Sequence, residues 1–438
     1  MRYNTGMRIF LPLAASCGLL FSGCSGTPIR HQPETLSLLV ATDLHMLTPE
    51  YMGGSSFSSM LAKSDMKLSE YADVLTDALI EQAGKERPDA LILTGDLTFN
   101  GEKKSHELLA EKLKQLTDQG IKVLVLPGNH DIDNPNAADW SGDKAVKAEA
   151  ITPEEFRSIY QEDGYADALY TDPSSLSYVS SLSDTCWILM LDSCEYEKNT
   201  IMSYSGGRIR EDTLNWLKPI LEEAMKNGIT VLSAMHHSLT DLVPSSDAYQ
   251  IENAEEVQKL FARYQVHVNF CGHTHFQAYR SIEVSGTEET DLMTGSLDVY
   301  QHLYAEVRLT TGESLEYHAR PLDVQAYAEA HHLTDPFFRD FDASSSKVFR
   351  TRIVQRMTDL FADTGLDEAA QKELLSLFAE EGEYLFAGKM GTFRSMFEGS
   401  EEEALVKSLP WKDQTMFLDN LKDYPDDMRD ITISLNPQ

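Results

Sequence analysis

Five short motifs rich in histidine and acidic residues occur along the chain in one fixed order. They are Asp43-Leu44-His45, Gly95-Asp96, Gly128-Asn129-His130-Asp131, His236-His237 and Gly272-His273-Thr274-His275. Their side chains offer carboxylate and amide oxygens together with imidazole nitrogens, a mixture that suits borderline cations such as Mn²⁺, Fe²⁺ or Zn²⁺. The set is large enough to hold two cations side by side, and paired cations are a common device for cleaving phosphate esters. The sequence therefore indicates a dinuclear metal centre.

The spacing within the motifs favours convergence on one cluster. In Asp-x-His and His-x-His, alternate side chains of an extended segment lie on the same side, so both members of a pair can reach one site. Gly95, Gly128 and Gly272 stand directly before a candidate ligand. A residue without a Cβ permits the tight turn and close backbone approach that such loops need.

Alternating strands and helices are expected to position these motifs. Apolar runs predict strands at residues 36–41, 90–93, 122–126, 186–191, 229–234 and 266–270. Helical patterns lie between them at residues 68–83, 102–118, 211–226 and 253–264. This alternation predicts an α/β layered domain. Each motif begins within about three residues of a predicted strand end, which is where α/β folds place their ligands.

The ordered motifs resemble those of the calcineurin-like metallophosphoesterase superfamily, over roughly residues 38–275. Within it, Gly95-Asp96-Leu97-Thr98, the His236-His237 pair and segment 208–217 are most similar to the cyclic-nucleotide phosphodiesterase branch. The chain also looks like the secreted lipoprotein members of that branch in Gram-positive bacteria. The usual His-His-Pro is replaced by His236-His237-Ser238, so the loop that the proline shapes is expected to differ. The resemblance implies a four-layer α/β/β/α sandwich with a helical C-terminal region.

The resemblance also implies how two divalent ions would be held. One metal ion would be bound by Asp43, His45 and His275, the other by Asn129, His236 and His273, with Asp96 bridging the two. The two metals would lower the pKa of a bridging water, and the resulting hydroxide would attack phosphorus in line. Two dications, two carboxylates and one hydroxide leave a local charge of about +1, which attracts a phosphate anion.

His130 belongs to the motif but is not a metal ligand in the family. By the resemblance, it would stabilise the developing charge or protonate the leaving oxygen, while Asp131 would orient its ring. Asn129 is a candidate for substrate contact as well as for metal binding. His237 is expected either to touch the substrate or merely to pack.

Two segments that follow the metal-ligand loops are expected to line the rim of the site. They are residues 46–60 and 132–150. Tyr51 or Trp140 could stack a nucleobase there, because an aromatic face accepts any base. Either residue could equally be an ordinary part of the rim.

The composition limits the partners of the protein. Apolar residues make up 42% of the 438 residues and charged residues 24%, which are the proportions of a globular protein. The formal net charge of -33 makes a nucleic-acid polymer an unexpected partner. Bound cations would still admit a small phosphate ester, because they reverse the sign of the charge locally.

The N-terminal sequence predicts export and lipid attachment. Arg2 and Arg8 precede the apolar run 9–21, which is followed by Ser-Gly and then Cys24. This resembles a bacterial lipoprotein signal, and the resemblance implies that residues 1–23 are removed and that Cys24 carries lipid. The alternative is an ordinary secretory signal with a chance cysteine. We expect a lipid-anchored protein outside the cytoplasm, on a bacterial membrane, with residues 24–35 as a tether.

The rest of the chain divides at about residue 325. Residues 36–325 hold the motifs and form the predicted metallophosphoesterase domain, and residues 326–438 form the predicted helical C-terminal domain. There Phe349, Ile353 and Met357 recur at helical spacing, as expected for a helix packed on the catalytic domain. The three cysteines after the tether are Cys186, Cys194 and Cys271, and we expect them to be small buried apolar residues.

These observations lead to a metal-dependent phosphodiesterase that hydrolyses cyclic nucleotides or related small phosphodiesters. A phosphomonoesterase or nucleotidase is the second enzymatic hypothesis, because the same ligands serve either reaction. A third, from another class, is a surface binding lipoprotein with a vestigial metal site. The sequence leaves the oligomeric state open.

Overall fold

The computed structural model describes residues 31–63, 66–242, 249–361, 367–409, 411–424 and 426–436. The signal peptide at 1–23, the lipidation site Cys24 and the tether residues 24–30 lie outside the described residues. Within the described part of the chain, no helix is both long and apolar enough to cross a membrane.

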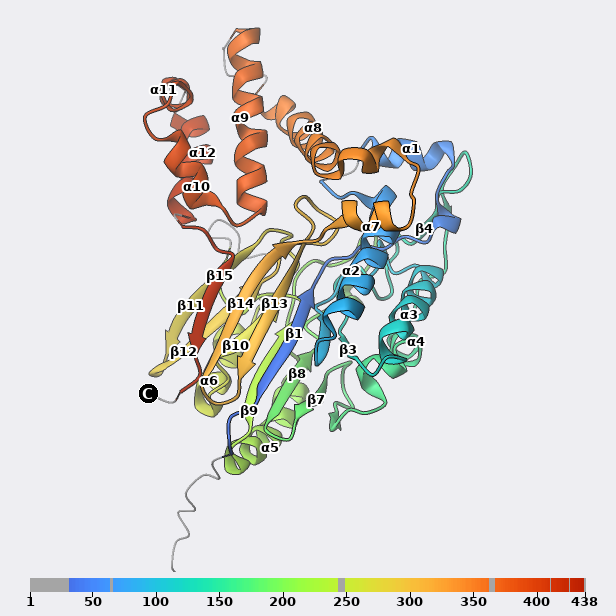
Figure 1. Ribbon diagram of the computed structural model, residues 1–438, viewed down its shortest axis with the longest axis vertical. Helices are drawn as coiled ribbons and strands as arrows, with labels where there is room; N and C mark the ends of the chain where they lie inside the picture. Colours follow the sequence, from blue (N-terminus) through green and yellow to red (C-terminus); the bar gives the residue numbers. More distant parts are fainter. Residues whose placement is uncertain are drawn as a thin grey trace, which may run out of the picture.

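Two large β-sheets pack face to face at the centre of the molecule (Figure 1). The first sheet has the order β15-β14-β13-β1-β2-β3. Its strands are β1 (Thr35–Ala41), β2 (Ala90–Leu93), β3 (Lys122–Val125), β13 (Leu303–Thr310), β14 (Ser314–Pro321) and β15 (Asp430–Ser434). The three strands β1, β2 and β3 are parallel, whereas β13, β14 and β15 add to the β1 side in antiparallel pairs.

The second sheet has the order β11-β12-β10-β9-β8-β7-β6. Its strands are β6 (Tyr170–Thr171), β7 (Tyr178–Ser183), β8 (Cys186–Leu191), β9 (Thr230–Met235), β10 (Val268–Cys271), β11 (Ala278–Val284) and β12 (Thr287–Met293). Strands β8, β9, β10 and β12 are parallel to one another. The predicted metal motifs therefore come from the parallel centres of both sheets.

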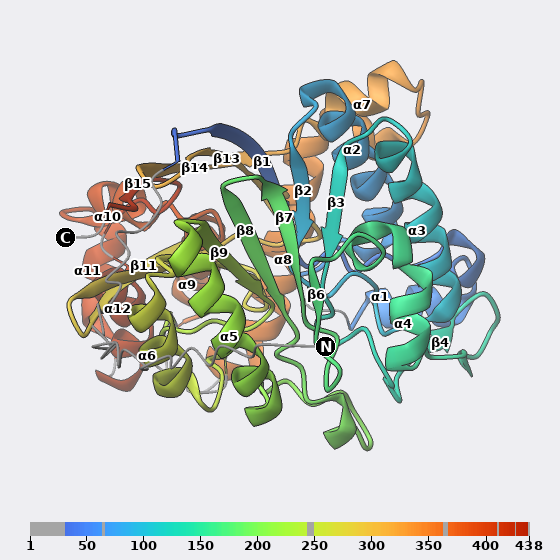
Figure 2. The same cartoon turned by 90° about the horizontal axis from the view of Figure 1, so that it is seen from below.

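Helices cover the outer face of each sheet (Figure 2). Over the first sheet lie α2 (Ala72–Glu86) and α3 (Lys103–Thr117), with α4 (Pro153–Ile159) packed beside α3. Over the second sheet lie α5 (Glu211–Asn227) and α6 (Ala254–Tyr264). This arrangement confirms the predicted four-layer α/β/β/α sandwich, and every strand and helix predicted in residues 36–270 is present with ends shifted by a few residues.

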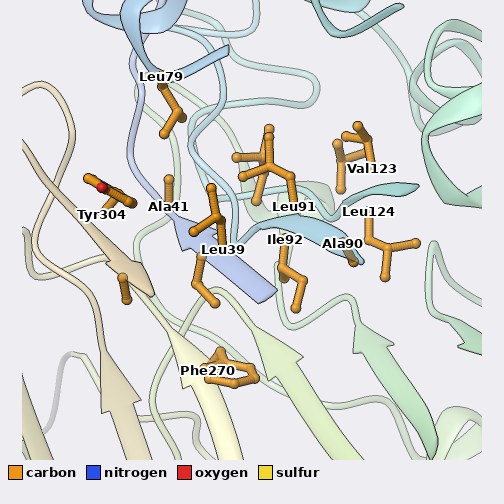
Figure 3. Packing of buried hydrophobic residues seen from close by; sticks show 14 of the residues in the cluster. Leu39, Ala41, Leu79, Ala90, Leu91, Ile92, Val123, Leu124, Phe270 and Tyr304 are labelled. Carbon is orange, nitrogen blue, oxygen red and sulfur yellow. The ribbon is translucent and has the colours of Figure 1, made fainter. Parts of the chain in front are cut away.

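The core fills the space between the two sheets and beneath the helices. Neighbouring residues of a strand point to opposite faces, so a strand buried on both sides is apolar throughout. Leu91 and Ile92 of β2 show this pattern, with Ile92 on the side of Phe270 from the second sheet (Figure 3). Cys186, Cys194 and Cys271 are free and buried, as predicted.

Two segments form a small layer over one side of the molecule, and we call residues 46–63 and 134–150 the cap. The cap contains a 3₁₀ turn (Pro49–Tyr51), α1 (Ser55–Leu61) and the short antiparallel pair β4 (Ala138–Asp139) and β5 (Val146–Lys147). It has its own buried apolar cluster, made by Leu47, Tyr51, Phe57, Ala137 and Ala148. The cap is therefore a packed unit rather than a pair of loose loops.

The C-terminal region is mostly helical, as predicted. Its helices are α7 (Val324–Ala330), α8 (Phe341–Phe361), α9 (Glu368–Phe386), α10 (Met390–Phe397), α11 (Glu401–Ser408) and α12 (Trp411–Asp423). One buried cluster joins Phe378 of α9 and Phe417 of α12 to Phe276 and Met293 of the catalytic part. The helices thus pack on the catalytic domain.

The end of the chain differs from the all-helical expectation for residues 326–438. After α12 the chain returns to the first sheet, where β15 pairs with β14 in antiparallel register, Ser434 facing Ser314. The strand has the alternating sequence Asp-Ile-Thr-Ile-Ser, too short to stand out beside the long helical pattern before it. The exact domain boundaries stay a prediction.

Candidate metal centre

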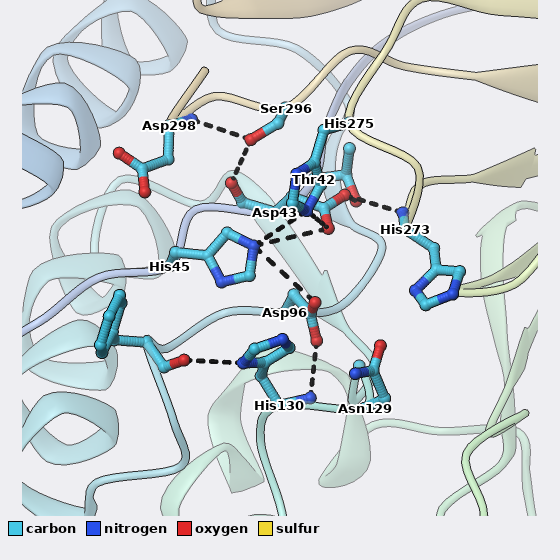
Figure 4. Close-up of polar contacts among 12 residues, drawn as sticks. Thr42, Asp43, His45, Asp96, Asn129, His130, His273, His275, Ser296 and Asp298 are labelled. Atoms are coloured by element: carbon cyan, nitrogen blue, oxygen red, sulfur yellow. Dashed lines mark hydrogen bonds and ion pairs between the residues drawn. The ribbon is translucent and has the colours of Figure 1, made fainter. Parts of the chain in front are cut away.

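The candidate ligands lie where strands of both sheets end. Asp43 follows β1, Asp96 follows β2 and Asn129 follows β3, all in the first sheet. His236 follows β9 and His273 follows β10 in the second sheet. The carboxyl ends of these parallel strands meet at one edge, so residues separated by more than two hundred positions become neighbours (Figure 4).

The first group of ligands is formed by Asp43, His45, Asp96 and His275, whose ligand atoms all lie within 4.8 Å of one another. Nε2 of His275 is 3.3 Å from Oδ1 of Asp43 and 3.2 Å from Nε2 of His45. Nε2 of His45 is 3.8 Å from Oδ2 of Asp96. These distances surround a space in which one cation can be bound.

The second group is formed by Asp96, His236 and His273, again within 4.8 Å. Nε2 of His236 is 3.4 Å from Oδ2 of Asp96 and 3.2 Å from Oδ1 of Asn129. Asp96 belongs to both groups, which is the position that a bridging carboxylate needs. The structure thus brings together all seven residues predicted to bind metal.

The backbone is strained at most of these ligands. Asp43, His45, Asp96, His273 and His275 have φ values of 51°, 43°, 47°, 75° and 69°, in the left-handed region that residues with a side chain rarely adopt. Such conformations persist only where the surrounding structure holds them, and they cluster at functional sites. Here backbone hydrogen bonds hold the first two ligands, from Asp43 N to Gly95 O and from His45 N to Asp96 O, both at 3.0 Å.

Two glycines allow the ligand loops to touch. A Cβ on Gly128 would lie 2.1 Å from the backbone nitrogen of Asp96, and one on Gly272 would lie 2.0 Å from Oγ1 of Thr42. No side chain fits at these distances, so the glycine that precedes each motif is required for close approach, as predicted.

The residues present fit a metal ion. Nε2 of His273 is buried and has no hydrogen-bond partner among the described residues. Oδ1 of Asp43 is buried and makes no hydrogen bond of good geometry there either, although Nε2 of His275 lies 3.3 Å away. Buried polar atoms without a partner are costly and rare. Two such atoms facing a cluster of oxygen and nitrogen donors are explained by a cation that pairs with them.

The electrostatics agree with this interpretation. Burial raises the pKa of Asp96, but His236 and His130 more than offset it, so the pKa lies well below the usual value. Burial lowers the pKa of His45 and of His273 well below the usual value. For His236, burial opposes protonation, yet Asp96 raises its pKa to about 9. Ionised carboxylates and neutral imidazoles are the forms that bind metal, and a cation would displace the proton of His236.

His130 lies beside this cluster, with its ring edge-on to His45 at 5.1 Å between centroids. Nδ1 of His130 is 2.9 Å from the carbonyl oxygen of Phe99 and 3.1 Å from Oδ1 of Asn100. A carbonyl only accepts hydrogen bonds, so Nδ1 carries the hydrogen of the neutral ring and Nε2 carries none.

The prediction that Asp131 orients the His130 ring is wrong. The Asp131 carboxylate accepts hydrogen bonds from the backbone nitrogens of Leu97, Thr98 and Gly128, at 2.8 to 3.0 Å. It therefore fixes the loops that carry Asp96 and Asn129. The ring of His130 is oriented instead by the Phe99 carbonyl and Asn100.

His237 was expected either to touch the substrate or merely to pack, and its surroundings favour packing. The residue is 0% exposed, and its Nδ1 and Nε2 lie 2.9 Å from Oγ of Ser193 and 3.2 Å from the carbonyl oxygen of Ser205. Its ring packs on His273 at 4.4 Å between centroids. Burial and the charge of His236 lower the pKa of His237 to about 3, so it is a neutral support for the metal ligands.

Two residues near His130, Asn100 and Lys67, belong to none of the five sequence motifs. Asn100 follows Gly95-Asp96 in the same loop, and nothing in the spacing distinguished it. Lys67 is only 6% exposed, and its charge adds to burial in lowering the pKa of His130 and His45. Its place depends on an isolated bridge between Lys67 and Val299, a tertiary contact that no local pattern reveals.

Comparison with known proteins supports this geometry. The model of the calcineurin-like phosphoesterase family matches residues 36–277, which include all five motifs. The chain is similar to a glycerophosphodiester phosphodiesterase of Enterobacter lignolyticus, with 26% identity over 193 residues, or 44% of this chain and 57% of that protein. Proteins named "probable cyclic nucleotide phosphodiesterase" from Moraxella catarrhalis and Synechococcus are 22% and 24% identical, over 45% and 55% of this chain and 62% and 74% of their own lengths. The chain thus spans less than two thirds of the first two of these curated relatives.

Two solved structures of phosphatases also align with the chain. A dimetal phosphatase from Danio rerio aligns with a TM-score of 0.47 and 14% identity, over 65% of this chain and 96% of that one. A purple acid phosphatase from yellow lupin aligns with a TM-score of 0.42 and 11% identity, over 66% and 52%. The family model spans more than half of the chain and contains every candidate ligand. The chain therefore belongs to the calcineurin-like phosphoesterase family.

Proposed function

We propose that the protein is a metal-dependent phosphodiesterase that hydrolyses cyclic nucleotides or related small phosphodiesters. The observation that carries the proposal is the position of Asp96, whose carboxylate belongs to both groups of candidate ligands. A shared carboxylate suits two adjacent cations, and such pairs act on phosphate esters. The curated relatives are phosphodiesterases by name, which supports a diester rather than a monoester substrate.

Seven residues would hold the two cations, for which manganese, iron or zinc suit the donor set. The first would be bound by Asp43, His45, Asp96 and His275, and the second by Asp96, Asn129, His236 and His273. When bound, the pair of cations lowers the pKa of water and neutralises the charge of the phosphate.

The residues around the cations would contact the phosphate and supply the proton for the leaving oxygen. Phe99 and Asn100 fix the ring of His130, which aims Nε2 at the substrate. A bound phosphate anion favours the imidazolium form of His130, in which Nε2 carries a proton for the leaving oxygen. Asn129 sits at the edge of the second group, 6% exposed, where its amide can also touch the phosphate.

A comparison of two nitrophenyl esters tests the proposal. Purified protein with added Mn²⁺ is expected to hydrolyse bis(p-nitrophenyl) phosphate with a higher kcat/KM than p-nitrophenyl phosphate. The Asp96→Asn variant, which removes the charge shared by both groups, is expected to lose both activities. Faster turnover of the monoester would favour the phosphomonoesterase hypothesis. No turnover of either ester with Mn²⁺, Fe²⁺ or Zn²⁺ would favour a binding protein with a vestigial site.

The cellular location is part of the proposal and rests on the sequence alone. The lipoprotein-like signal at residues 1–23 and Cys24 support a protein that is anchored by lipid outside the cytoplasm. Its substrates would then be small phosphate esters outside the cell membrane.

A further inference from the structure

A cavity of about 680 Å³ opens beside His130, between the catalytic domain and the cap. Its lining includes Phe99 and Asn100, the two residues that orient the His130 ring, but none of the seven candidate metal ligands. The cavity therefore lies on the His130 side of the metal centre. Binding sites for small molecules commonly have volumes of about 300 to 1,000 Å³, so this space is sufficient for a nucleoside.

The wall that the cap contributes is fixed in position. Gly54, at the start of α1, approaches the opposite segment so closely that a Cβ would lie 2.1 Å from the carbonyl oxygen of Gly142. Oγ of Ser56 donates to the carbonyl oxygens of Trp140 and Gly142, at 3.1 and 2.8 Å. The backbone nitrogen of Trp140 donates to Tyr51 O at 3.0 Å. These bonds fix the backbone of Trp140, a residue that lines the cavity.

The chemistry of the lining suits a planar heterocycle with polar edges. Trp140, Phe99 and Met60 supply aromatic and thioether surface. Asn100 and Asn136 supply amide groups that can donate to and accept from the edge of a base. An aromatic face stacks on any nucleobase, whereas a methyl or glycerol group would leave this surface uncovered.

The position of His130 determines which half of a diester enters the cavity. If His130 gives its proton to the leaving oxygen, the alcohol that leaves must lie on the His130 side of phosphorus. We infer that the cavity binds the nucleoside half of a phosphodiester as the leaving alcohol. This inference rests on the proposed function and adds which substrate half is recognised and which bond is cleaved.

The reaction balances as a hydrolysis. The oxygen of water forms a bond to phosphorus, and the bond between phosphorus and the nucleoside oxygen breaks. The nucleoside oxygen takes a proton from Nε2 of His130, and a proton of the attacking water is released. For a diester of two separate alcohols, the products are a free nucleoside and a phosphate monoester of the other alcohol. In a cyclic nucleotide both ester oxygens belong to one nucleoside, so the same step gives a nucleoside monophosphate.

A mixed diester with two similar alkyl leaving groups tests the direction of cleavage. The probe is the methyl ester of adenosine 5′-phosphate, incubated with the metal-loaded full chain, and the products are separated by liquid chromatography. We expect adenosine and methyl phosphate as the main products. Mainly adenosine 5′-phosphate and methanol would overturn the inference, even while the diesterase activity of the proposed function stands. No hydrolysis of this ester or of bis(p-nitrophenyl) phosphate would instead overturn the proposed function.

Variants of the cavity wall supply a second readout. Trp140→Ala is expected to raise KM for the adenosine ester roughly tenfold, since stacking on an aromatic ring is worth a few kcal/mol per base at most. Trp140→Phe is expected to keep KM for the adenosine ester close to the wild-type value. KM for dimethyl phosphate, which has no base, is expected to stay unchanged in both variants. Equal effects on the two substrates would contradict a base-binding role.

Two further variants separate a binding defect from a folding defect. Ser59 of α1 is exposed on the cavity wall, so Ser59→Trp fills the cavity without removing a core contact. It is expected to weaken the binding of adenosine to the metal-loaded protein, as measured by titration calorimetry. Trp216→Ala removes a half-buried tryptophan of α5, on the other side of the molecule, and is the matched control (Figure 2). Unchanged adenosine binding in Ser59→Trp, or equal weakening in Trp216→Ala, would place the nucleoside elsewhere.

Discussion

His130 is held by a backbone carbonyl and an amide, Phe99 O and Asn100 Oδ1, rather than by an acid. A carboxylate partner would stabilise the imidazolium form permanently, whereas a carbonyl fixes the ring and leaves its charge to respond to the substrate. The chemistry that we propose for His130 is thus separated from the structural task of the adjacent Asp131, which ties two ligand loops together.

Substitution of this histidine should separate metal binding from catalysis. His130→Ala is expected to retain both metal ions, because the ring is not part of either ligand group, and to lose roughly 100- to 10,000-fold in kcat, the usual contribution of a general acid. Metal content by elemental analysis and turnover of bis(p-nitrophenyl) phosphate check both parts. The control is His332→Asn, which changes an exposed histidine of the C-terminal region. Turnover of the diester near the wild-type rate would refute the role of His130.

The sequence predicts the metal ligands better than it predicts the residues that hold those ligands in place. Asp43, Asp96 and His273 were predicted because ligand type and spacing follow from metal chemistry and strand periodicity, both of which are local. The roles of Asp131 and His237 depend on contacts with main-chain atoms and with Ser193, and Lys67 reaches the site through a tertiary bridge. Motif membership alone does not distinguish a residue that touches substrate from one that supports it.

Strand β12 carries two buried acidic residues, Glu289 and Asp291. Glu289 is 4% exposed, and neither of its carboxylate oxygens has a hydrogen-bond partner among the described residues. Asp291, two positions along the same face, accepts from the backbone nitrogens of Leu239 and Thr240 at 2.8 and 2.6 Å. Burial, and next the charge of Asp291, raise the pKa of Glu289 to about 8. The strand thus places a poorly compensated acid next to Asp291, which binds the loop that follows His236 and His237.

This acid should make the stability of the protein depend on pH. Between pH 4.5 and 8 the folded chain keeps a proton on Glu289 that the unfolded chain loses, so the free energy of unfolding falls as pH rises through this range. The Glu289→Gln variant cannot ionise at this position. Its stability relative to the wild type is expected to rise by on the order of 4 kcal/mol between pH 4.5 and pH 8, because the pKa of Glu289 is about 8 in the folded chain and 4.5 in the unfolded chain. Urea unfolding at both pH values measures the change.

The neighbouring residue supplies the control for this test. Glu288 lies next to Glu289 in β12 but is exposed, so Glu288→Gln removes the same charge from a solvated position. It is expected to leave the pH profile of stability unchanged. Parallel pH profiles of the wild type and Glu289→Gln would show that Glu289 ionises freely in the folded protein.

The elements that the sequence predicted are those buried on both faces. Strands β1, β2 and β8 are apolar runs between two layers, and the helices between them show clear periodicity. Strand β11, in which only Ala278 is buried, and strand β12, which begins Thr-Glu-Glu-Thr, lack a continuous apolar signal. Strands without a continuous apolar run, whether at the edge like β11 or inside the sheet like β12, are therefore the part of the sheets that the sequence did not reveal.

The whole molecule combines a strongly acidic surface with a predicted membrane anchor. A net charge of -33 is repelled by the anionic lipids of a bacterial membrane, so electrostatic attraction cannot hold the protein there. Among the described residues no helix crosses a membrane. The attachment that we propose is the lipid at Cys24, which the sequence predicts.

Replacement of this cysteine tests the anchor. Cys24→Ala is expected to move the exported protein from the membrane fraction to the soluble fraction, because two acyl chains bind a bilayer stably and none would remain. Cys186→Ala, a buried cysteine of the catalytic domain, is the control and is expected to stay with the membrane. High salt should not release the wild-type protein, since salt weakens only electrostatic attachment. Release of the wild type by salt, or membrane retention of Cys24→Ala, would mean that another part of the chain overcomes the repulsion.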